Sequence, residues 1–188
     1  MRAALAIVLA AVLGFSGCMS EQVVLESPRK VDIAGVEVDA APLAEALLAE
    51  VRGVKAVSLQ GSWNDNAFSA ECVLKGDGEE LSVVFLAPQM RLATLRLHRP
   101  CVVEWERSPM VPEAFKPEYA IFDLAVFYLP VPALRRALGP AFSVTEVGTT
   151  RRVCHGGDAV VSIIAQKDGG AKLENALWEY EYVVKEIR

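Results

Sequence analysis

The sequence predicts a small α+β domain whose largest part is an antiparallel sheet, and three observations lead to this class. Apolar and polar residues alternate with a period of two in many short segments, and turn residues separate these segments. A stretch with helical features, residues 117–138, divides the strand segments into two groups. Hydrophobic residues make up 53% of the chain, which is enough to fill an apolar interior. We therefore expect residues 42–188 to form a single β-rich domain.

The first group of strands follows a short helix. Pro42 opens a run with leucines at helical spacing, and Gly53 lies just beyond its end, which is the proline-first, glycine-last pattern of a helix. From Lys55 the apolar residues alternate, and Gly76-Asp77-Gly78 supplies a hairpin turn. Because the connections are short, we expect a meander of antiparallel strands. These strands are predicted near 55–63, 68–75, 80–86, 90–98 and 101–107.

The middle of the chain has a different character. Prolines make residues 108–112 an irregular crossing, and Pro117 begins a strongly apolar helical run. Two further prolines interrupt this run near residue 130, and residues 133–138 are predicted to form a second short helix before Gly139. Strands are expected again at 142–147, 149–154, 159–166, 172–177 and 179–187.

The N-terminus has the three parts of an export signal, namely a basic start, an apolar stretch from Ala3 to Phe15, and small residues. A membrane-spanning helix needs roughly twenty residues, so this stretch is too short. Phe15-Ser16-Gly17-Cys18 resembles the lipobox of bacterial lipoproteins, in which the signal is removed and the cysteine is acylated. We expect residues 1–17 to be a lipoprotein signal peptide and Cys18 to carry palmitate-type chains. The alternatives are an ordinary secretory signal with a chance cysteine, and an uncleaved anchor.

The residues after Cys18 bear on localisation. Residues 18–41 are mixed and polar, and we expect them to form a lipidated tether in which part of 31–38 adds an edge strand. Met19 and Ser20 follow the cysteine, in place of the aspartate that resembles an inner-membrane retention signal. This indicates attachment by lipid to the periplasmic face of the bacterial outer membrane.

Charge and motifs weigh against several classes of function. The formal net charge of −5 gives no electrostatic reason to bind nucleic acid or anionic lipid headgroups. The predicted domain has no Gly-x-Ser-x-Gly elbow and no phosphate-binding loop. His98 and His155, the only histidines, lack the spacing of metal ligands. We therefore expect no enzymatic activity, no metal and no cofactor.

Two further sets of residues give no indication of a catalytic site. Glu104 and Glu106 alternate with Val103 and Trp105, which indicates a solvated strand face and not an acid/base pair. Three cysteines follow Cys18, an odd number, so at least one thiol stays free or pairs between chains. These cysteines are Cys72, Cys101 and Cys154.

A resemblance to known proteins adds to these inferences. Leu81 to Leu138, particularly VFLAP at 84–88 and WERSPMVP at 105–112, resembles an uncharacterised family of bacterial lipoproteins with a domain of unknown function. The run FYLPVPALRRAL within 124–138 and Leu173-Glu174-Asn175-Ala176 with Tyr182 also look like this family. The layout is similar to LolA and LolB, the lipoprotein carrier and its outer-membrane receptor. The resemblance implies a curved antiparallel half-barrel with a helical lid over a cavity for acyl chains.

The resulting expectation is a non-enzymatic lipoprotein that takes part in envelope lipid or lipoprotein traffic. Its ligand would be an acyl chain, the acyl part of another lipoprotein, or another apolar group. The alternative is an interaction subunit of an envelope biosynthesis or export assembly, without a cavity, that contacts a protein partner through residues 108–117. An enzyme acting on acyl chains through Asp123 or His155 is the third hypothesis. The expected ligand-binding residues are Phe68, Leu74, Phe85, Val103, Trp105, Phe122, Phe127 and Tyr128.

Overall fold

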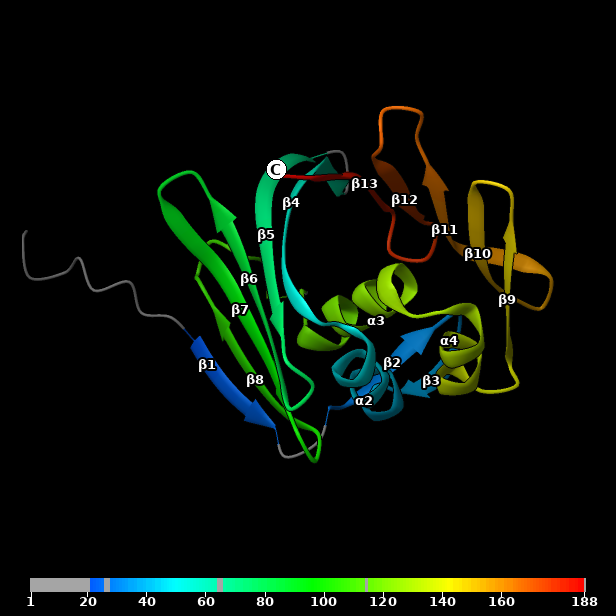
Figure 1. The fold of residues 1–188 in the computed structure, drawn as a ribbon, viewed down its shortest axis with the longest axis horizontal. Coiled ribbons are helices and arrows are strands. Elements are labelled where there is room, and N and C mark those ends of the chain that lie inside the picture. The colour runs from blue at the N-terminus through cyan, green and yellow to red at the C-terminus, as the bar shows by residue number, and fades with distance from the viewer. Residues whose placement is uncertain (1–20, 26–27, 64–65, 114, 188) are drawn as a thin grey trace, which may run out of the picture.

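A single 11-stranded antiparallel sheet dominates the computed structural model, which describes residues 21–25, 28–63, 66–113 and 115–187 (Figure 1). The expected signal peptide and Cys18 lie outside these residues. The sheet contains β1 (Glu21–Leu25), β4 (Gly53–Trp63), β5 (Asn66–Gly76), β6 (Glu80–Ala87), β7 (Met90–His98), β8 (Val102–Arg107), β9 (Phe142–Val147), β10 (Thr150–His155), β11 (Asp158–Ala165), β12 (Ala171–Asn175) and β13 (Tyr180–Glu186).

The sheet consists of two meanders that meet in its middle. Its strand order is β1-β8-β7-β6-β5-β4-β13-β12-β11-β10-β9, so the first strand of one meander pairs with the last strand of the other. The α+β class and the two predicted groups of antiparallel strands are confirmed. β1 and β9 remain as separate edges, so the sheet is not closed. It is also not strongly curled, and the expected curved half-barrel is therefore not shown. Figure 1 shows the two meanders on either side of the helices.

Gly61 makes the junction between the two meanders possible. It lies opposite Tyr182 in the β4–β13 pair. A Cβ atom at position 61 would overlap the backbone of Glu181 and Tyr182. Only glycine lets the two strands approach this closely, and the two meanders share one sheet as a result.

The segment expected to be a tether folds with the domain. β1 pairs with β8, and β2 (Lys30–Ile33) and β3 (Val36–Asp39) form a separate two-stranded sheet. The strand expected within 31–38 is thus a hairpin, and not an edge of the main sheet. Ala34 and Gly35 both have positive φ, which suits a tight two-residue hairpin turn. The apolar residues alternate, and Ile33 is fully buried, because one face of the hairpin packs into the core.

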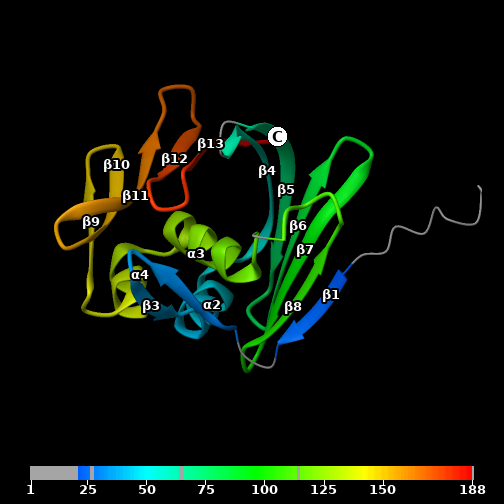
Figure 2. The same ribbon diagram turned by 180° about the vertical axis from the view of Figure 1, so that it is seen from behind.

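Three helices pack together beside the sheet (Figure 2). They are α2 (Ala41–Glu50), α3 (Pro117–Tyr128) and α4 (Val131–Leu138), and they confirm the helix predicted after Pro42 and the helical insertion at 117–138. Arg151 of β10 donates hydrogen bonds of 2.8 Å to the carbonyls of Val126 and Leu129. These are among the last carbonyls of α3, so Arg151 satisfies and holds that end of the helix. None of the helices in the described ranges is long and apolar enough to cross a membrane.

Candidate functional site

The most concentrated polar contact between the helices and the sheet is at Asp123. Tyr180 donates a hydrogen bond of 2.7 Å to the Asp123 carboxylate, and Tyr182 donates one of 3.0 Å. The Asn175 amide donates a bond of 3.0 Å to the Tyr180 hydroxyl. The two tyrosines are two residues apart on β13, so they share one face of the strand. Asp123 therefore joins α3 to β13.

Burial controls the protonation of this group. Burial raises the pKa of the Asp123 carboxyl to about 7, and the hydrogen bonds from Tyr180 and Tyr182 oppose that rise. Burial also raises the pKa of both tyrosines well above its usual range, and the nearby Asp123 charge adds to the effect. Both hydroxyls therefore remain protonated donors near neutral pH, where Asp123 itself is close to half ionised.

A row of aromatic side chains surrounds this carboxyl group. Neighbouring ring centroids are 6.3 Å apart for Phe68 and Tyr182, 5.9 Å for Tyr182 and Tyr180, and 6.1 Å for Tyr180 and Trp178. Trp178 lies 4.1 Å from Tyr119 of α3. Phe127, also of α3, stacks on Tyr182 at 6.2 Å. We call Phe68, Tyr119, Phe127, Trp178, Tyr180 and Tyr182 the aromatic row.

Most of the aromatic row is packed against the core, and only its Phe68 end is exposed. Phe68 keeps 37% of its surface accessible, and the other five members are half-buried. Tyr119, Asp123 and Phe127 are spaced by four residues, so they lie on one face of α3 and point toward β13. The arrangement offers aromatic faces to an apolar group, with one polar group, the Asp123 carboxyl, among them.

The residues expected to bind a ligand separate into three places. Phe68 and Phe127 belong to the aromatic row, and Tyr128 adjoins it, with its ring 6.4 Å from that of Phe127. Phe85 and Trp105 lie around Phe115, at centroid distances of 6.1 and 5.7 Å. Leu74, Val103 and Phe122 are core residues with 0–1% of their surface exposed. The structure therefore brings some of the eight together, but not all of them.

Sequence reasoning missed Tyr119, Trp178, Tyr180 and Tyr182 as members of the site. Tyr180 and Tyr182 were available from the sequence as an alternating aromatic pair on an expected strand. Their partner on α3 could not be identified from the sequence, because the pairing depends on where the helix crosses the sheet.

The helices and the sheet share one hydrophobic core in the described ranges. Phe122, Leu134 and Leu47, one from each helix, are fully buried within a single core that continues into the sheet. Two surface hollows, of about 290 and 590 Å³, are lined by none of the eight expected residues. The aromatic row borders this core and is more accessible than the core residues.

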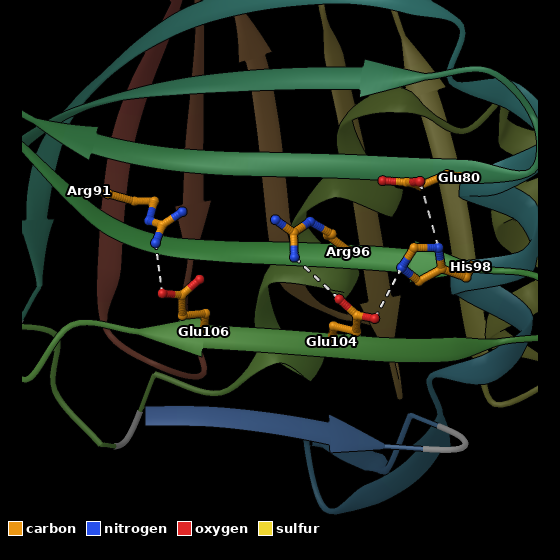
Figure 3. A network of polar contacts seen from close by, with 6 residues as sticks. All are labelled: Glu80, Arg91, Arg96, His98, Glu104 and Glu106. Carbon is orange, nitrogen blue, oxygen red and sulfur yellow. Dashed lines mark hydrogen bonds and ion pairs between the residues drawn. The ribbon is translucent and has the colours of Figure 1, made fainter. Parts of the chain in front are cut away.

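The outer face of the first meander carries a network of charged side chains (Figure 3). Arg91 pairs with Glu106 at 2.7 Å and Arg96 with Glu104 at 3.3 Å. The His98 ring lies between Glu104, at 3.6 Å, and Glu80, at 3.8 Å. The prediction that Glu104 and Glu106 form a strand face turned away from the core is confirmed, and both have basic partners.

The remaining reactive side chains are dispersed. The His155 ring lies 3.1 Å from the Ala141 carbonyl, whereas both hydrogen bonds to Asp123 come from tyrosines. Within the described ranges no three His, Cys, Asp or Glu side chains are grouped to hold a metal ion. Cys72, Cys101 and Cys154 are free thiols, and burial raises the pKa of Cys72 to about 12.

Comparison with known proteins gives one match. Residues 57–188 match a family described as "Protein of unknown function (DUF3261)". The matched part contains most of β4, all of β5–β13, and helices α3 and α4. It therefore includes Asp123 and the whole aromatic row. No curated protein and no solved structure matches the chain.

Proposed function

The chain belongs to the DUF3261 family, and from this premise we propose that it is a non-enzymatic lipoprotein that binds an acyl chain or another apolar group. The lipobox-like Phe15-Ser16-Gly17-Cys18 supports acylation of Cys18. Met19 and Ser20 after it support the periplasmic face of the outer membrane. Two or more acyl chains on one cysteine give stable anchoring, since each buried methylene contributes about 0.8 kcal/mol.

The aromatic row is the observation that carries this proposal. Aromatic side chains usually bury their rings, and six of them that are linked by ring contacts and stay partly accessible form a surface that an apolar ligand can cover. The ligand lies along α3 and β13, with its chain on the rings. Asp123, whose pKa is near 7, and the tyrosine hydroxyls can exchange hydrogen bonds with a polar end of the same molecule.

The arrangement is LolA/LolB-like in one respect, the order of its elements. A group of strands, a helical insertion and a second group of strands follow one another, and the insertion packs beside the sheet. The proposed ligand site differs from a closed cavity in that it lies at the margin between α3 and β13.

The proposal includes no catalysis because Asp123 and His155 already have other hydrogen-bond partners. The Asp123 oxygens accept bonds from Tyr180 and Tyr182, and His155 faces a backbone carbonyl. Acyl transfer requires a nucleophile in contact with a base. Among the bonds described, Asp123 contacts no such pair.

Titration with a fluorescent fatty acid tests the proposal. Phe68→Ala shortens an exposed end of the aromatic row and should weaken probe binding several-fold, as one lost ring contact costs about 1 kcal/mol. Val147→Ala is the matched control, because Val147 is 77% exposed on a different strand, β9. Equal probe affinity in both variants and in the parent protein would contradict the proposed site.

The second candidate function is an interaction subunit of an envelope assembly. The surface segment 108–112, where Met110 is 71% exposed, favours it. This function predicts that the parent protein binds no apolar probe at all, and that outcome would replace the first proposal.

A further inference from the structure

The register of β1 determines which end of the sheet lies closest to Cys18. Glu21, the first residue of β1, pairs with Arg107, and Arg107 pairs with Ala93 of β7 on its other side. β1 and β7 both run antiparallel to β8, so the residues that precede each of them lie beyond the same end of the sheet. Figures 1 and 2 show that the start of β1 and the β6–β7 turn lie toward the same end of these strands.

Covalent geometry limits how far Cys18 can be from that end. Glu21 is three positions after Cys18. An extended chain covers at most about 3.6 Å per position, so the two Cα atoms are within roughly 11 Å. On β7, Met90 also precedes the Ala93–Arg107 pair by three residues, which corresponds to about 10 Å along a strand. The β6–β7 turn and Cys18 can therefore lie at the same height above a membrane.

The same end of the sheet carries two segments without charge. One is the tip of the β6–β7 hairpin, Leu86-Ala87-Pro88-Gln89-Met90, and the other is the loop after β8, Ser108-Pro109-Met110-Val111-Pro112. In a chain in which 23% of residues are charged, ten uncharged residues in two adjacent segments are unusual. We call these two segments the apolar end.

The two segments of the apolar end form one surface. Ser108 donates its backbone N–H to the Leu92 carbonyl at 2.8 Å. Residues of both segments, including Met90 and Pro109, line one shallow hollow together with the Arg91–Glu106 ion pair. The Arg107 guanidinium donates to the Val111 carbonyl at 2.9 Å, and Val111 donates its N–H to Ser108 at 3.0 Å. These bonds hold the loop in shape, with Met110 71% exposed at its tip.

The geometry points to the apolar end as a surface that lies on the lipid bilayer when Cys18 is acylated. The inference rests on the proposed acylation of Cys18, and it assigns the protein a second membrane contact besides the lipid. Because the Cα atom of an acylated Cys18 lies within roughly 11 Å of that of Glu21, this end of the sheet comes to the headgroup region, where uncharged side chains such as Met110 can enter the acyl boundary.

Depth-dependent fluorescence tests the assignment in the full acylated protein. Met110→Trp is reconstituted into phosphatidylethanolamine and phosphatidylglycerol vesicles whose acyl chains are brominated, and its emission is compared with that of the parent protein. The added emission should be quenched. Val147→Trp is the matched control, because Val147 is equally exposed on β9, the opposite edge strand, and its added emission should be unchanged.

The outcomes separate the two proposals. Intact mass of the same preparation shows whether Cys18 carries acyl chains. Acylated, vesicle-bound protein in which Met110→Trp is not quenched, or is quenched no more than Val147→Trp, overturns this inference alone and leaves the surface available to a protein partner. Protein without acyl chains on Cys18 overturns the proposed anchoring and this inference together.

Discussion

Tyr182 donates a hydrogen bond of 3.0 Å to Asp123 and thereby connects β13, the last strand in the sequence, to the middle of α3. The two residues are 59 positions apart, and Tyr180 reinforces the same contact. Because the carboxyl group is held among aromatic rings, this one contact determines both the position of the helix and the pH at which the site changes charge.

The raised pKa of Asp123 predicts a pH dependence of stability. The folded-state pKa is about 7 against an ordinary value of 3.8, so the folded state binds this proton more tightly than the unfolded state. The contribution of Asp123 to the free energy of unfolding is fully present below pH 4 and is lost as the pH rises to about 7. Asp123→Asn should remove this loss, on the order of 4 kcal/mol over the full pH range.

Urea unfolding at pH 5 and pH 8 measures this effect. The parent protein should lose stability relative to Asp123→Asn between the two values, whatever the other carboxylates contribute to both proteins. A difference between the two proteins that does not change with pH would contradict the assignment of Asp123.

Tyr182→Phe removes the hydroxyl group and keeps the aromatic ring. The ring contacts with Phe68 and Phe127 remain, so the expected cost is that of one hydrogen bond, about 1 kcal/mol. The lost bond had lowered the pKa of Asp123, which should therefore rise further. Carboxyl NMR titration reports this change, and a fall in the pKa would refute the geometry described.

Gly61→Val should be severely destabilising, because the side chain would overlap the backbone of Glu181 and Tyr182 where the two meanders join. Gly156→Ala is the comparison, since a Cβ atom at Gly156 meets nothing within 4 Å and the change costs only the strain of its positive φ, roughly 1 kcal/mol. Thermal unfolding of both variants checks the prediction, and equal melting temperatures would contradict it.

Arg151→Met should destabilise the protein by about 2 kcal/mol, since two carbonyls at the end of α3 lose their donor. Arg152→Met alters the neighbouring exposed position and should have an effect within about 0.5 kcal/mol. If urea unfolding shows the two variants to be equally stable, Arg151 does not support the helix end.

The sequence predicted most of the fold because the local patterns agree with the tertiary structure. The alternating residues of β5 through β8 and the proline boundaries of α3 and α4 are local signals, and each element forms where it was expected. The hairpin at residues 30–39, where a single edge strand was expected, has a physical cause. The polar composition concealed an alternation at Val31 and Ile33 that becomes buried only after the hairpin meets the core.

The candidate site was only partly predictable. Phe68 and Phe127 could be named as apolar residues of a strand and a helix, but Trp178 lies in the turn before β13 and outside the strands that were expected there. The contact of Asp123 with Tyr180 depends on the pairing of β13 with β4, which joins the two ends of the matched region. Such long-range pairing is not encoded in any single segment.

Native mass spectrometry of the protein extracted gently from its membrane tests the central claim most directly. The account predicts acyl chains attached covalently at Cys18 and, in addition, a noncovalently bound apolar molecule that Phe68→Ala loses and Val147→Ala retains. Acylated protein that carries no noncovalent ligand, and in which no fluorescent fatty acid binds along the aromatic row, would contradict it.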